Sequence, residues 1–319
     1  MSSEFARISD IAKQFGPLNP RATGGPHVRI GIGDDAAVLE APREGELVWT
    51  IDEQVQDTHF SFAWLTPYDV GYRATVAATS DIAAMGATPW CALAALSLSS
   101  DFSDDALREL TRGQADAARR MGLCIVGGNL ARGPCVAITT TVLGTASRSV
   151  TRSGAKPGDL VLVAGPLGEA AAGLRALQLE MNALGEVIDR WRRPTAQVEA
   201  GRELSLHDVH AAIDVSDGLA QDLSHVALAS GVRVVIEVDR LSACCSDALR
   251  LASKALDMDP LQLMLTGGED YSLVVTCARL IEGYTCIGRV ESGEGLFIDE
   301  NNRVTPLAPK GYDHFKLWR

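Results

Sequence analysis

The amino-acid sequence predicts a two-domain α/β (α+β) protein, and three observations support that prediction. Short apolar runs bounded by Gly or Pro alternate with helical patterns along the whole chain, an order typical of mixed α/β folds. A length of 319 residues leaves room for one large or two medium domains, at ~100–200 residues each. The segment 151–159 (TRSGAKPGD) is polar, rich in turn residues and close to the midpoint. We therefore expect domains over residues 1–150 and 151–319.

The first half is expected to contain two helices and five strands. Thr66 and Pro67 suit the N-cap and the first helical position, and the small-residue pattern over residues 69–85 ends at Gly86. Ser103 and Gly122 bound a second helix over residues 104–121 in the same way. Strands are expected at residues 28–32, 47–51, 90–98, 123–126 and 136–146, and Gly127-Gly128 ends the fourth.

The second half repeats the alternation of strands and helices. A strand at residues 160–164 leads through a glycine-rich turn into a helix that begins at Glu169. Further elements are expected in the order strand 212–215, helix 219–229, strand 233–238 and strand 273–276.

Composition excludes several functional classes. With 29 Lys and Arg against 41 Asp and Glu, the formal net charge is −12, so no basic field favours binding to nucleic acid. Apolar stretches such as residues 90–98 are far shorter than the ~18–20 residues of a membrane span. No secretory signal is visible at the N-terminus, which favours a cytoplasmic protein with no membrane partner. The seven cysteines include no C-x-x-C pair and are expected to be buried, reduced thiols.

Several Asp residues stand where solvated surface charge is not expected. They occupy strand ends or a small-residue helix, in the segments 33–35 (GDD), 50–52 (TID), 80–81 (SD) and 214–218 (DVSDG). Carboxylates at strand ends point out of the sheet edge, where the ligands of α/β proteins collect. Because converging carboxylates repel one another, cations are expected among them. Mg²⁺ held by one or two carboxylates together with substrate phosphates is the usual arrangement.

Each of these Asp residues, taken alone, could equally be a helix N-cap or a turn residue. Two positions weaken that explanation. Strand alternation aims Asp214 and Ser216 to one side, and Asp217 with Gly218 then makes the turn into a helix. Asp81 lies among small side chains that should pack closely, so its charge requires a partner.

Glycine pairs and histidines are weaker signals. Gly127-Gly128 follows a strand and Gly267-Gly268 precedes one, so either pair could bring backbone N–H groups close to a phosphate or form an ordinary turn. Neither a P-loop nor a dinucleotide fingerprint is present, so nucleotide binding would need another scheme. His59 lies near the acidic segments and could be functional or structural. No metalloprotease, nucleophile-elbow or Cys/His motif indicates zinc hydrolysis or a nucleophilic triad.

The motifs form a series that covers nearly the whole chain. In order they are EF at 4–5, IGDDAA at 32–37, Asp52 with HF at 59–60, SDIAAMGA at 80–87, GGN at 127–129, RSGAKPGD at 152–159, IDVSDGL at 213–219, GGEDY at 267–271 and GYDHF at 311–315. This series resembles the thiamine-monophosphate kinase family, part of the aminoimidazole-ribonucleotide-synthetase-like ATP-binding superfamily. The combination is specific, because other families of that superfamily share only parts of it.

The resemblance implies ATP-dependent phosphorylation of thiamine monophosphate to thiamine diphosphate. Transfer would be direct and in-line, assisted by Mg²⁺, with no covalent nucleophile on the enzyme. The implied metal ligands are Asp35, Thr50, Ile51, Asp52, Asp81, Asn129, Asp214 and Asp217. The implied ATP contacts are Gly128, Asn129, Arg152 and Ser216, and the implied contacts to thiamine phosphate are His59, Glu269 and Tyr312. The resemblance also implies a PurM-like fold and a homodimer formed through the sheet of the N-terminal α/β domain.

The chain departs from the family pattern at three places. Asn129 stands where the family usually has Asp, Ile51 replaces a hydroxyl residue, and the segment 53–58 (EQVQDT) is more polar than usual. Two alternatives therefore stay open: another ATP-dependent phosphotransferase or synthetase of the same superfamily, or a nucleotide-binding module with reduced turnover. Selenophosphate synthesis is disfavoured because the first cysteine is Cys91, which leaves no N-terminal Cys nucleophile.

Overall fold

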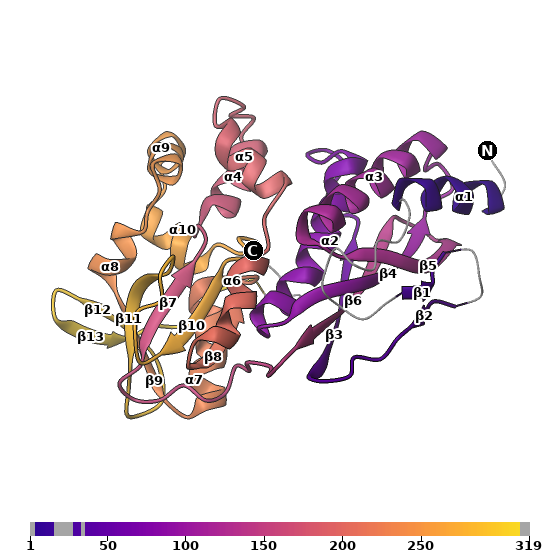
Figure 1. Ribbon diagram of the computed structural model, residues 1–319. Helices are drawn as coiled ribbons and strands as arrows, with labels where there is room; N and C mark the ends of the chain where they lie inside the picture. The colour runs from indigo at the N-terminus through magenta and orange to yellow at the C-terminus, as the bar shows by residue number, and fades with distance from the viewer. Residues whose placement is uncertain (1–3, 16–27, 33–35, 313–319) are drawn as a thin grey trace. The chain divides into compact units, whose positions relative to one another are not determined.

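The structure, a computed structural model, describes residues 4–15, 28–32 and 36–312. The chain divides into two compact units, which are coloured in sequence order in Figure 1. Unit 1 comprises residues 1–82 and 87–149, and unit 2 comprises residues 83–86 and 150–319. The short segment 83–86 groups with unit 2, where the backbone N–H of Val150 donates to the carbonyl of Met85. The boundary between residues 150 and 151 stays a prediction, and Asp35 lies outside the described residues.

Unit 1 is built on a four-stranded sheet in the order β3-β6-β4-β5. Neighbouring strands are antiparallel except β4 and β5, which are parallel. In chain order the elements are α1 (Glu4–Phe15), β1 (Val28–Ile30), β2 (Val38–Leu39), β3 (Glu46–Val55), α2 (Pro67–Ala84), β4 (Thr88–Leu98), α3 (Asp104–Met121), β5 (Cys124–Arg132) and β6 (Ala137–Ala146). Figure 1 shows α2 and α3 lying over one face of this sheet.

The two long helices of unit 1 begin and end close to where the sequence predicts. Ser103 accepts a hydrogen bond from the backbone N–H of Ala106, and Gly122 ends α3 with a φ of +74°. The helices α2 and α3 pack closely through glycines on both sides. A Cβ at Gly71 would lie 2.0 Å from the carbonyl oxygen of Leu110, and one at Gly113 would lie 2.0 Å from that of Tyr68. The small residues of α2 therefore serve helix packing.

The other face of the sheet carries an exposed apolar row on β3. Leu47, Trp49 and Ile51 are 54%, 73% and 68% exposed, and they alternate with half-buried or buried residues along the strand. Leu93 of β4, at 40% exposure, lies on the same face two strands away, with Thr141 of β6 between it and Ile51. We call these four residues the exposed apolar face. Contiguous apolar surface of this kind marks a binding surface more often than scattered single residues do.

Unit 2 is built on a seven-stranded sheet in the order β13-β12-β9-β11-β7-β10-β8. Its pairs are antiparallel except β9 with β12. The elements are β7 (Leu160–Ala164), α4 (Glu169–Gln178), α5 (Gly185–Arg192), α6 (Val198–Glu203), η1 (Leu204–Leu206), β8 (Val209–Asp214), α7 (Leu219–Ser230), β9 (Arg233–Glu237), α8 (Val238–Ala243), α9 (Asp247–Leu256), α10 (Pro260–Thr266), β10 (Leu273–Cys277), β11 (Thr285–Glu291), β12 (Gly295–Glu300) and β13 (Arg303–Pro306).

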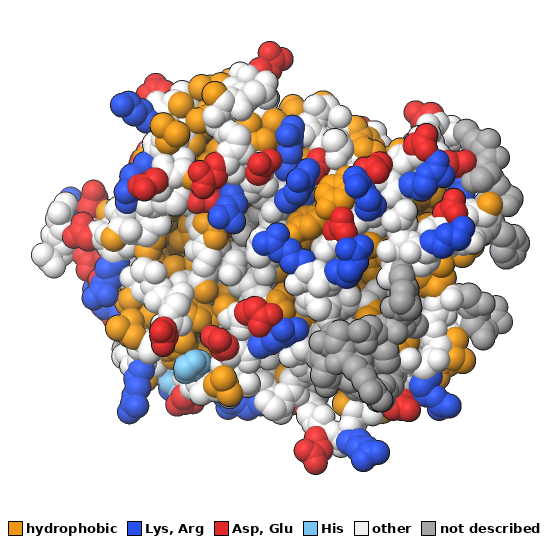
Figure 2. All heavy atoms as spheres, turned by 45° about the horizontal axis from the view of Figure 1, so that its top comes forward, with side chains coloured by type: hydrophobic (Ala, Val, Ile, Leu, Met, Phe, Trp, Pro, Cys, Tyr) orange, Lys and Arg blue, Asp and Glu red, His pale blue; other side chains and the backbone are white. Residues whose placement is uncertain are grey.

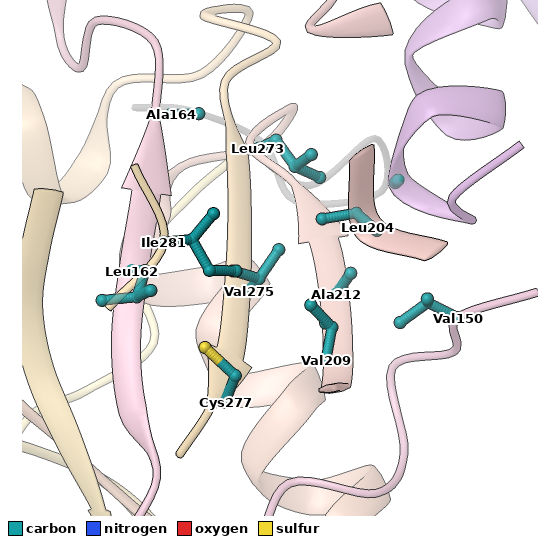
Figure 3. Close-up of a cluster of buried hydrophobic side chains, with 11 residues drawn as sticks. Val150, Leu162, Ala164, Leu204, Val209, Ala212, Leu273, Val275, Cys277 and Ile281 are labelled. Atoms are coloured by element: carbon teal, nitrogen blue, oxygen red, sulfur yellow. The ribbon is translucent and has the colours of Figure 1, made fainter. Parts of the chain in front are cut away.

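The core of unit 2 lies against the central strands of this sheet. Figure 3 shows side chains from β7, β8 and β10, among them Leu162, Ala212 and Val275, converging with Leu204 and Ile281. These side chains are nearly fully buried, and burial of that kind contributes roughly 1.5–3 kcal/mol for each large aliphatic group. The core fixes the strand β8, whose last residue, Asp214, therefore reaches the sheet edge in a defined position.

The expected strands and helices are found, with one informative difference in β5. That strand runs through Gly127 and Gly128 to Arg132, so the glycine pair lies inside a strand and not after one. All seven cysteines are described and are free thiols, three of them buried and four half-buried. Among the described residues, no helix is long and apolar enough to cross a membrane.

Candidate functional site

Unit 1 places three of the predicted site residues together on the helix-covered side of its sheet. Alternation along β3 turns Thr50 and Asp52 to the side opposite the exposed apolar face. The Thr50 hydroxyl donates a hydrogen bond of 2.6 Å to Oδ2 of Asp81, which comes from the last turns of α2. The charge of Asp81 thus has the partner that its small-residue surroundings require. We call Thr50, Asp52 and Asp81 the β3–α2 acidic group.

Two other predicted residues of unit 1 lie on the opposite face. The side chain of Ile51 belongs to the exposed apolar face. Asn129 is exposed, and the sheet register aligns it with Ala95, then Thr139, then Glu53. Glu53 and Thr139 directly follow and precede the cross-strand pair of Asp52 with Thr140, so their side chains lie on the face opposite Asp52. Within one copy of the sheet, Ile51 and Asn129 are therefore separated from the β3–α2 acidic group, and their roles stay predictions.

Gly128 owes its lack of a side chain to the neighbouring strand. A Cβ at this position would lie 1.9 Å from the carbonyl oxygen of Ala94 on β4, so no other residue fits without moving the sheet. Neither a turn nor a phosphate is needed to explain this glycine. The register nevertheless aligns it with Ala94, Thr140 and Asp52 in one row across the four strands.

His59 lies just beyond β3 and is fixed by local contacts. Its Nδ1 accepts a hydrogen bond of 2.9 Å from the backbone N–H of Val55, and the backbone N–H of His59 donates to the Val55 carbonyl. Because Nδ1 is an acceptor, the neutral ring carries its proton on Nε2. The ring is thus held in one orientation by the end of the strand, which is compatible with either the structural or the functional interpretation.

Unit 2 brings five predicted residues together where three loops meet. The loops are residues 214–218, 267–271 and 311–312, and we call them the unit 2 loop cluster. Backbone hydrogen bonds join them, from Glu269 N–H to the Ser216 carbonyl at 2.8 Å and from Tyr312 N–H to the Asp217 carbonyl at 3.0 Å. Gln221 adds a bond from its side-chain amide to the Tyr312 carbonyl at 2.8 Å. The cluster carries the side chains of Asp214, Ser216, Asp217, Glu269 and Tyr312.

Asp222, which the sequence interpretation did not single out, organises the first of these loops. Its Oδ2 accepts hydrogen bonds from three consecutive backbone N–H groups, those of Ser216, Asp217 and Gly218, at 3.1, 3.2 and 3.1 Å. Burial, followed by the nearby charges of Asp214 and Asp217, raises the pKa of Asp222 to about 8. The only sequence signal was an Asp in the first turn of a helix after a glycine, which is a common pattern.

The second loop is held by a side chain of α5 and by backbone N–H groups at the start of α4. The indole N–H of Trp191 donates a hydrogen bond of 2.7 Å to Oε2 of Glu269. Asp270 accepts from the backbone N–H groups of Gly168 and Ala170 at the start of α4. Burial raises the pKa of Asp270 to about 7. Glu269 has a φ of +65°, a left-handed conformation that is uncommon for a non-glycine residue.

Arg152 does not share the contacts of the unit 2 loop cluster. It is exposed, and its carbonyl oxygen accepts a hydrogen bond from Ser230, the last residue of α7. The neighbouring Thr151 carbonyl accepts from the backbone N–H of Ala212 on β8. The segment around Arg152 is therefore fixed against β8 and the end of α7, whereas Asp217 lies before the start of that helix.

Comparison with known proteins identifies the family. The family model for "AIR synthase related protein, N-terminal domain" matches residues 33–146, and that for the C-terminal domain matches residues 156–297. The thiamine-monophosphate kinase of Pyrococcus abyssi is 35% identical over 90% of this chain and 91% of its own. That of Salmonella typhimurium is 36% identical over 90% of this chain and 92% of its own. The chain belongs to the thiamine-monophosphate kinase family.

Solved structures of the family agree with the fold. The thiamine-monophosphate kinase of Stenotrophomonas maltophilia K279a matches with a TM-score of 0.81 and 32% identity, over 93% of this chain and 96% of that one. A structure described as "AaThiL complexed with AMPPCP and TMP" matches with a TM-score of 0.80 and 31% identity, over 98% and 97%. The hydrogenase maturation protein HypE, at 21% identity and a TM-score of 0.75, shares the fold. The predicted two-domain PurM-like α/β fold is confirmed.

The donor atoms on this family member suit magnesium-bound phosphates. The β3–α2 acidic group and the unit 2 loop cluster both offer carboxylate and hydroxyl oxygens, which are the protein ligands that Mg²⁺ prefers. Among the described residues, no three Asp, Glu, His or Cys side chains form a preformed metal cage. Mg²⁺ in proteins is usually held by one or two carboxylates together with oxygens from substrate phosphates or water. Elsewhere, acidic and basic side chains are interspersed on the face in Figure 2, and α3 pairs three of its arginines with acids one turn away.

Proposed function

We propose that the chain transfers the γ-phosphoryl group of ATP to thiamine monophosphate, giving thiamine diphosphate and ADP. Membership of the thiamine-monophosphate kinase family supports this activity. The observation that carries it is the unit 2 loop cluster, where backbone bonds hold two Asp residues, a Ser and a Glu around one another. Phosphoryl transfer depends on positioning and charge neutralisation and not on a covalent nucleophile, and that is the chemistry these groups can supply.

Each unit would supply oxygen ligands for the cations that bind the phosphates. In unit 1, Thr50, Asp52 and Asp81 would ligate cations, and in unit 2 Asp214 and Asp217 would do so. Magnesium ions, when bound, would neutralise the phosphate oxygens and the charge that develops during transfer. Asp222 fixes the backbone of residues 216–218, which keeps the Ser216 hydroxyl and the Asp217 carboxylate in place. Asp35, Gly128, Asn129 and Arg152 remain proposed contacts by family resemblance.

The acceptor, the phosphate group of thiamine monophosphate, needs to be oriented by the protein but does not need to be deprotonated by it. A terminal phosphate oxygen of thiamine monophosphate is already ionised near neutral pH, so it can attack the γ-phosphorus without a strong general base. The new oxygen–phosphorus bond would form in line with the breaking bond to ADP. His59, Glu269 and Tyr312 are the proposed acceptor contacts, and the bond from Trp191 holds the Glu269 carboxylate in one orientation.

A homodimer formed through unit 1 is part of the proposal. The exposed apolar face presents Leu47, Trp49 and Ile51 in a row on one strand, and a second copy of the same face would cover it symmetrically. Trp49→Lys should convert the dimer to monomers in size-exclusion chromatography with light scattering. Leu228→Lys alters a leucine of unit 2 that is 82% exposed, and it should leave the mass unchanged. A dimer that survives Trp49→Lys would contradict this interface.

A direct assay tests the proposed activity. Purified protein with ATP, Mg²⁺ and thiamine monophosphate should release ADP and thiamine diphosphate in equal amounts, and chelation of Mg²⁺ should stop the reaction. ATP binding without a phosphorylated product would overturn the proposal and favour the nucleotide-binding module that Asn129 and Ile51 suggest. Product formed only from another small acceptor would instead identify a different phosphotransferase of the superfamily.

A further inference from the structure

Asp52 has two polar neighbours that the proposed chemistry does not use. Gln54 lies two residues along the same strand and donates a hydrogen bond of 3.2 Å from its side-chain amide to Oδ1 of Asp52. Its own side chain is only 7% exposed. Thr140 lies directly opposite Asp52 on the adjacent strand β6. Side chains of such cross-strand partners share one face, with Cβ atoms about 4.5–5.5 Å apart.

The hydroxyl of Thr140 is buried without a hydrogen-bond partner among the described residues. Thr140 is 1% exposed, and its Oγ1 forms no hydrogen bond there. The neighbouring residues of β6 on the same face, Ile138 and Val142, are apolar and fully buried. An unpartnered hydroxyl in such surroundings costs stability, so Val, which has the same shape, would suit packing better. The position therefore retains a donor that packing alone disfavours, and it retains it beside Asp52.

We propose that Thr140 and Gln54 are positioning residues for the Asp52 carboxylate. Gln54 holds one carboxylate oxygen along the strand, and the Thr140 hydroxyl lies on the adjacent strand β6, placed to donate a hydrogen bond to the carboxylate from its buried side. Asp52 itself is half-buried. Carboxylates that bind metal ions are commonly oriented by hydrogen bonds from residues behind them. The inference rests on the proposed function, because it takes Asp52 as a magnesium ligand.

Two Thr140 variants separate positioning from packing. Thr140→Val removes the hydroxyl and keeps the shape, whereas Thr140→Ser keeps the hydroxyl. Thr276→Val is the matched control, because Thr276 of unit 2 is also 1% exposed with an unpartnered Oγ1 and is not a neighbour of Asp52 in the sheet. Gln54→Leu tests the second donor, and Asp52→Asn tests the proposed ligand. Each variant is measured for Tm without metal, for Mn²⁺ affinity by electron paramagnetic resonance, and for the Mg²⁺ dependence of kcat.

Opposite changes in stability and metal affinity are expected for Thr140→Val. Its Tm without metal should rise, because a buried unpartnered hydroxyl is removed, while Mn²⁺ binding weakens about 10-fold or more. Thr140→Ser should bind Mn²⁺ within about twofold of the parent protein, since the donor is kept. Gln54→Leu should weaken Mn²⁺ binding in the same direction. Thr276→Val should raise Tm and leave Mn²⁺ affinity unchanged.

The outcomes distinguish this inference from the function on which it rests. If Asp52→Asn loses Mn²⁺ affinity but Thr140→Val and Gln54→Leu do not, the positioning role is wrong and the proposed function stands. If Asp52→Asn itself binds Mn²⁺ like the parent protein, the metal assignment fails and the inference fails with it. If Thr140→Val does not fold, a weakened Mn²⁺ affinity in Gln54→Leu with parent-like Thr140→Ser still supports the role, and parent-like affinity in Gln54→Leu overturns it.

Discussion

The two groups of oxygen ligands are built in different ways. In unit 1 they stand on regular elements, and one side chain holds another, as Thr50 does when it donates to Asp81. In unit 2 most of them stand on loops, with Asp214 at the last residue of β8, and backbone bonds such as that from Tyr312 to Asp217 hold the loops together. A strand or helix fixes a side chain through its own ladder of hydrogen bonds, whereas a loop needs external anchors.

This difference decides which substitutions should separate function from folding. In the unit 2 loop cluster the backbone carries the geometry, so the ligand side chains can change while the loops persist. In the β3–α2 acidic group the side chains of Thr50 and Asp81 hold each other, so a change at one of these two residues also disturbs the other. Asp222 and Trp191 bond to the loops from neighbouring helices. Substitutions at these two residues should affect both the geometry of the ligands and the stability of the loops.

Asp217→Asn should have the largest effect on turnover with little effect on folding. Its backbone groups bond to Asp222 and Tyr312, and these bonds do not require the carboxylate. Loss of a metal ligand should lower kcat about 100-fold or more, because metal-borne stabilisation is worth several kcal/mol. Steady-state ADP release measures this, and Asp247→Asn, an exposed carboxylate that pairs with Arg250, is the control. A large fall in Tm for Asp217→Asn would break the comparison.

Trp191→Phe should have a smaller and more selective effect. It removes the indole N–H that holds Glu269, and a hydrogen bond to a charged group is worth about 1.5–3 kcal/mol. The KM for thiamine monophosphate should rise about 10-fold, and the KM for ATP should stay within about twofold. Trp90→Phe is a matched control, because Trp90 is equally buried and its indole N–H has no partner among the described residues. Equal changes in both KM values would show a structural role only.

Asp270→Asn should flatten the pH dependence of stability. Burial raises the pKa of Asp270 from 3.8 to about 7, so its protonated form favours folding. That contribution is complete below the unfolded pKa and is lost as the pH rises through about 7. The parent Tm should therefore fall between about pH 4 and 7, and the variant should fall less over the same range. Asp222, whose pKa is also raised, should retain part of the slope, and an unchanged slope in Asp270→Asn would contradict the role of burial.

Ile51→Thr should have the smallest effect and would sharpen the contrast between the two faces of β3. It restores the hydroxyl that the family pattern contains, but the side chain of residue 51 lies on the exposed apolar face, away from Asp52. The kcat and the apparent affinity for Mg²⁺ should stay within about twofold of the parent values. A clear gain in Mg²⁺ affinity would show that the hydroxyl of residue 51 reaches the metal after all.

Local signals made much of the fold predictable. Cap residues such as Ser103 and Gly122 gave the bounds of α3 correctly, because capping depends on neighbouring residues alone. The last third of unit 2 was less predictable from the sequence. Strands β11 to β13 and helices α8 to α10 were not predicted, although β11 and α9 are as long as predicted elements such as β7 and α4. Length therefore does not explain the difference, and the formation of such elements depends on packing with distant parts of the chain.

Site residues on strands and in acidic motifs were visible, but the groups that hold them were not. Asp222 looks like any Asp in a first helical turn, and Thr140 looks like any β-branched residue in a strand. Their significance comes from contacts with residues about 5 and 90 positions away, which periodicity does not encode. Gly128 shows the reverse case, because its glycine is explained by the nearby carbonyl of Ala94 and not by the turn that its sequence suggests.

The exposed row on β3 also bears on how the newly made chain avoids aggregation. β3 is the edge of its sheet, and an edge strand with apolar side chains is a template on which other chains can stack. Glu46 and Glu53 flank Leu47, Trp49 and Ile51 and are themselves exposed, and flanking charges of this kind oppose such stacking. The row that would join two folded copies is thus also a hazard during synthesis, and two glutamates act as its gatekeepers.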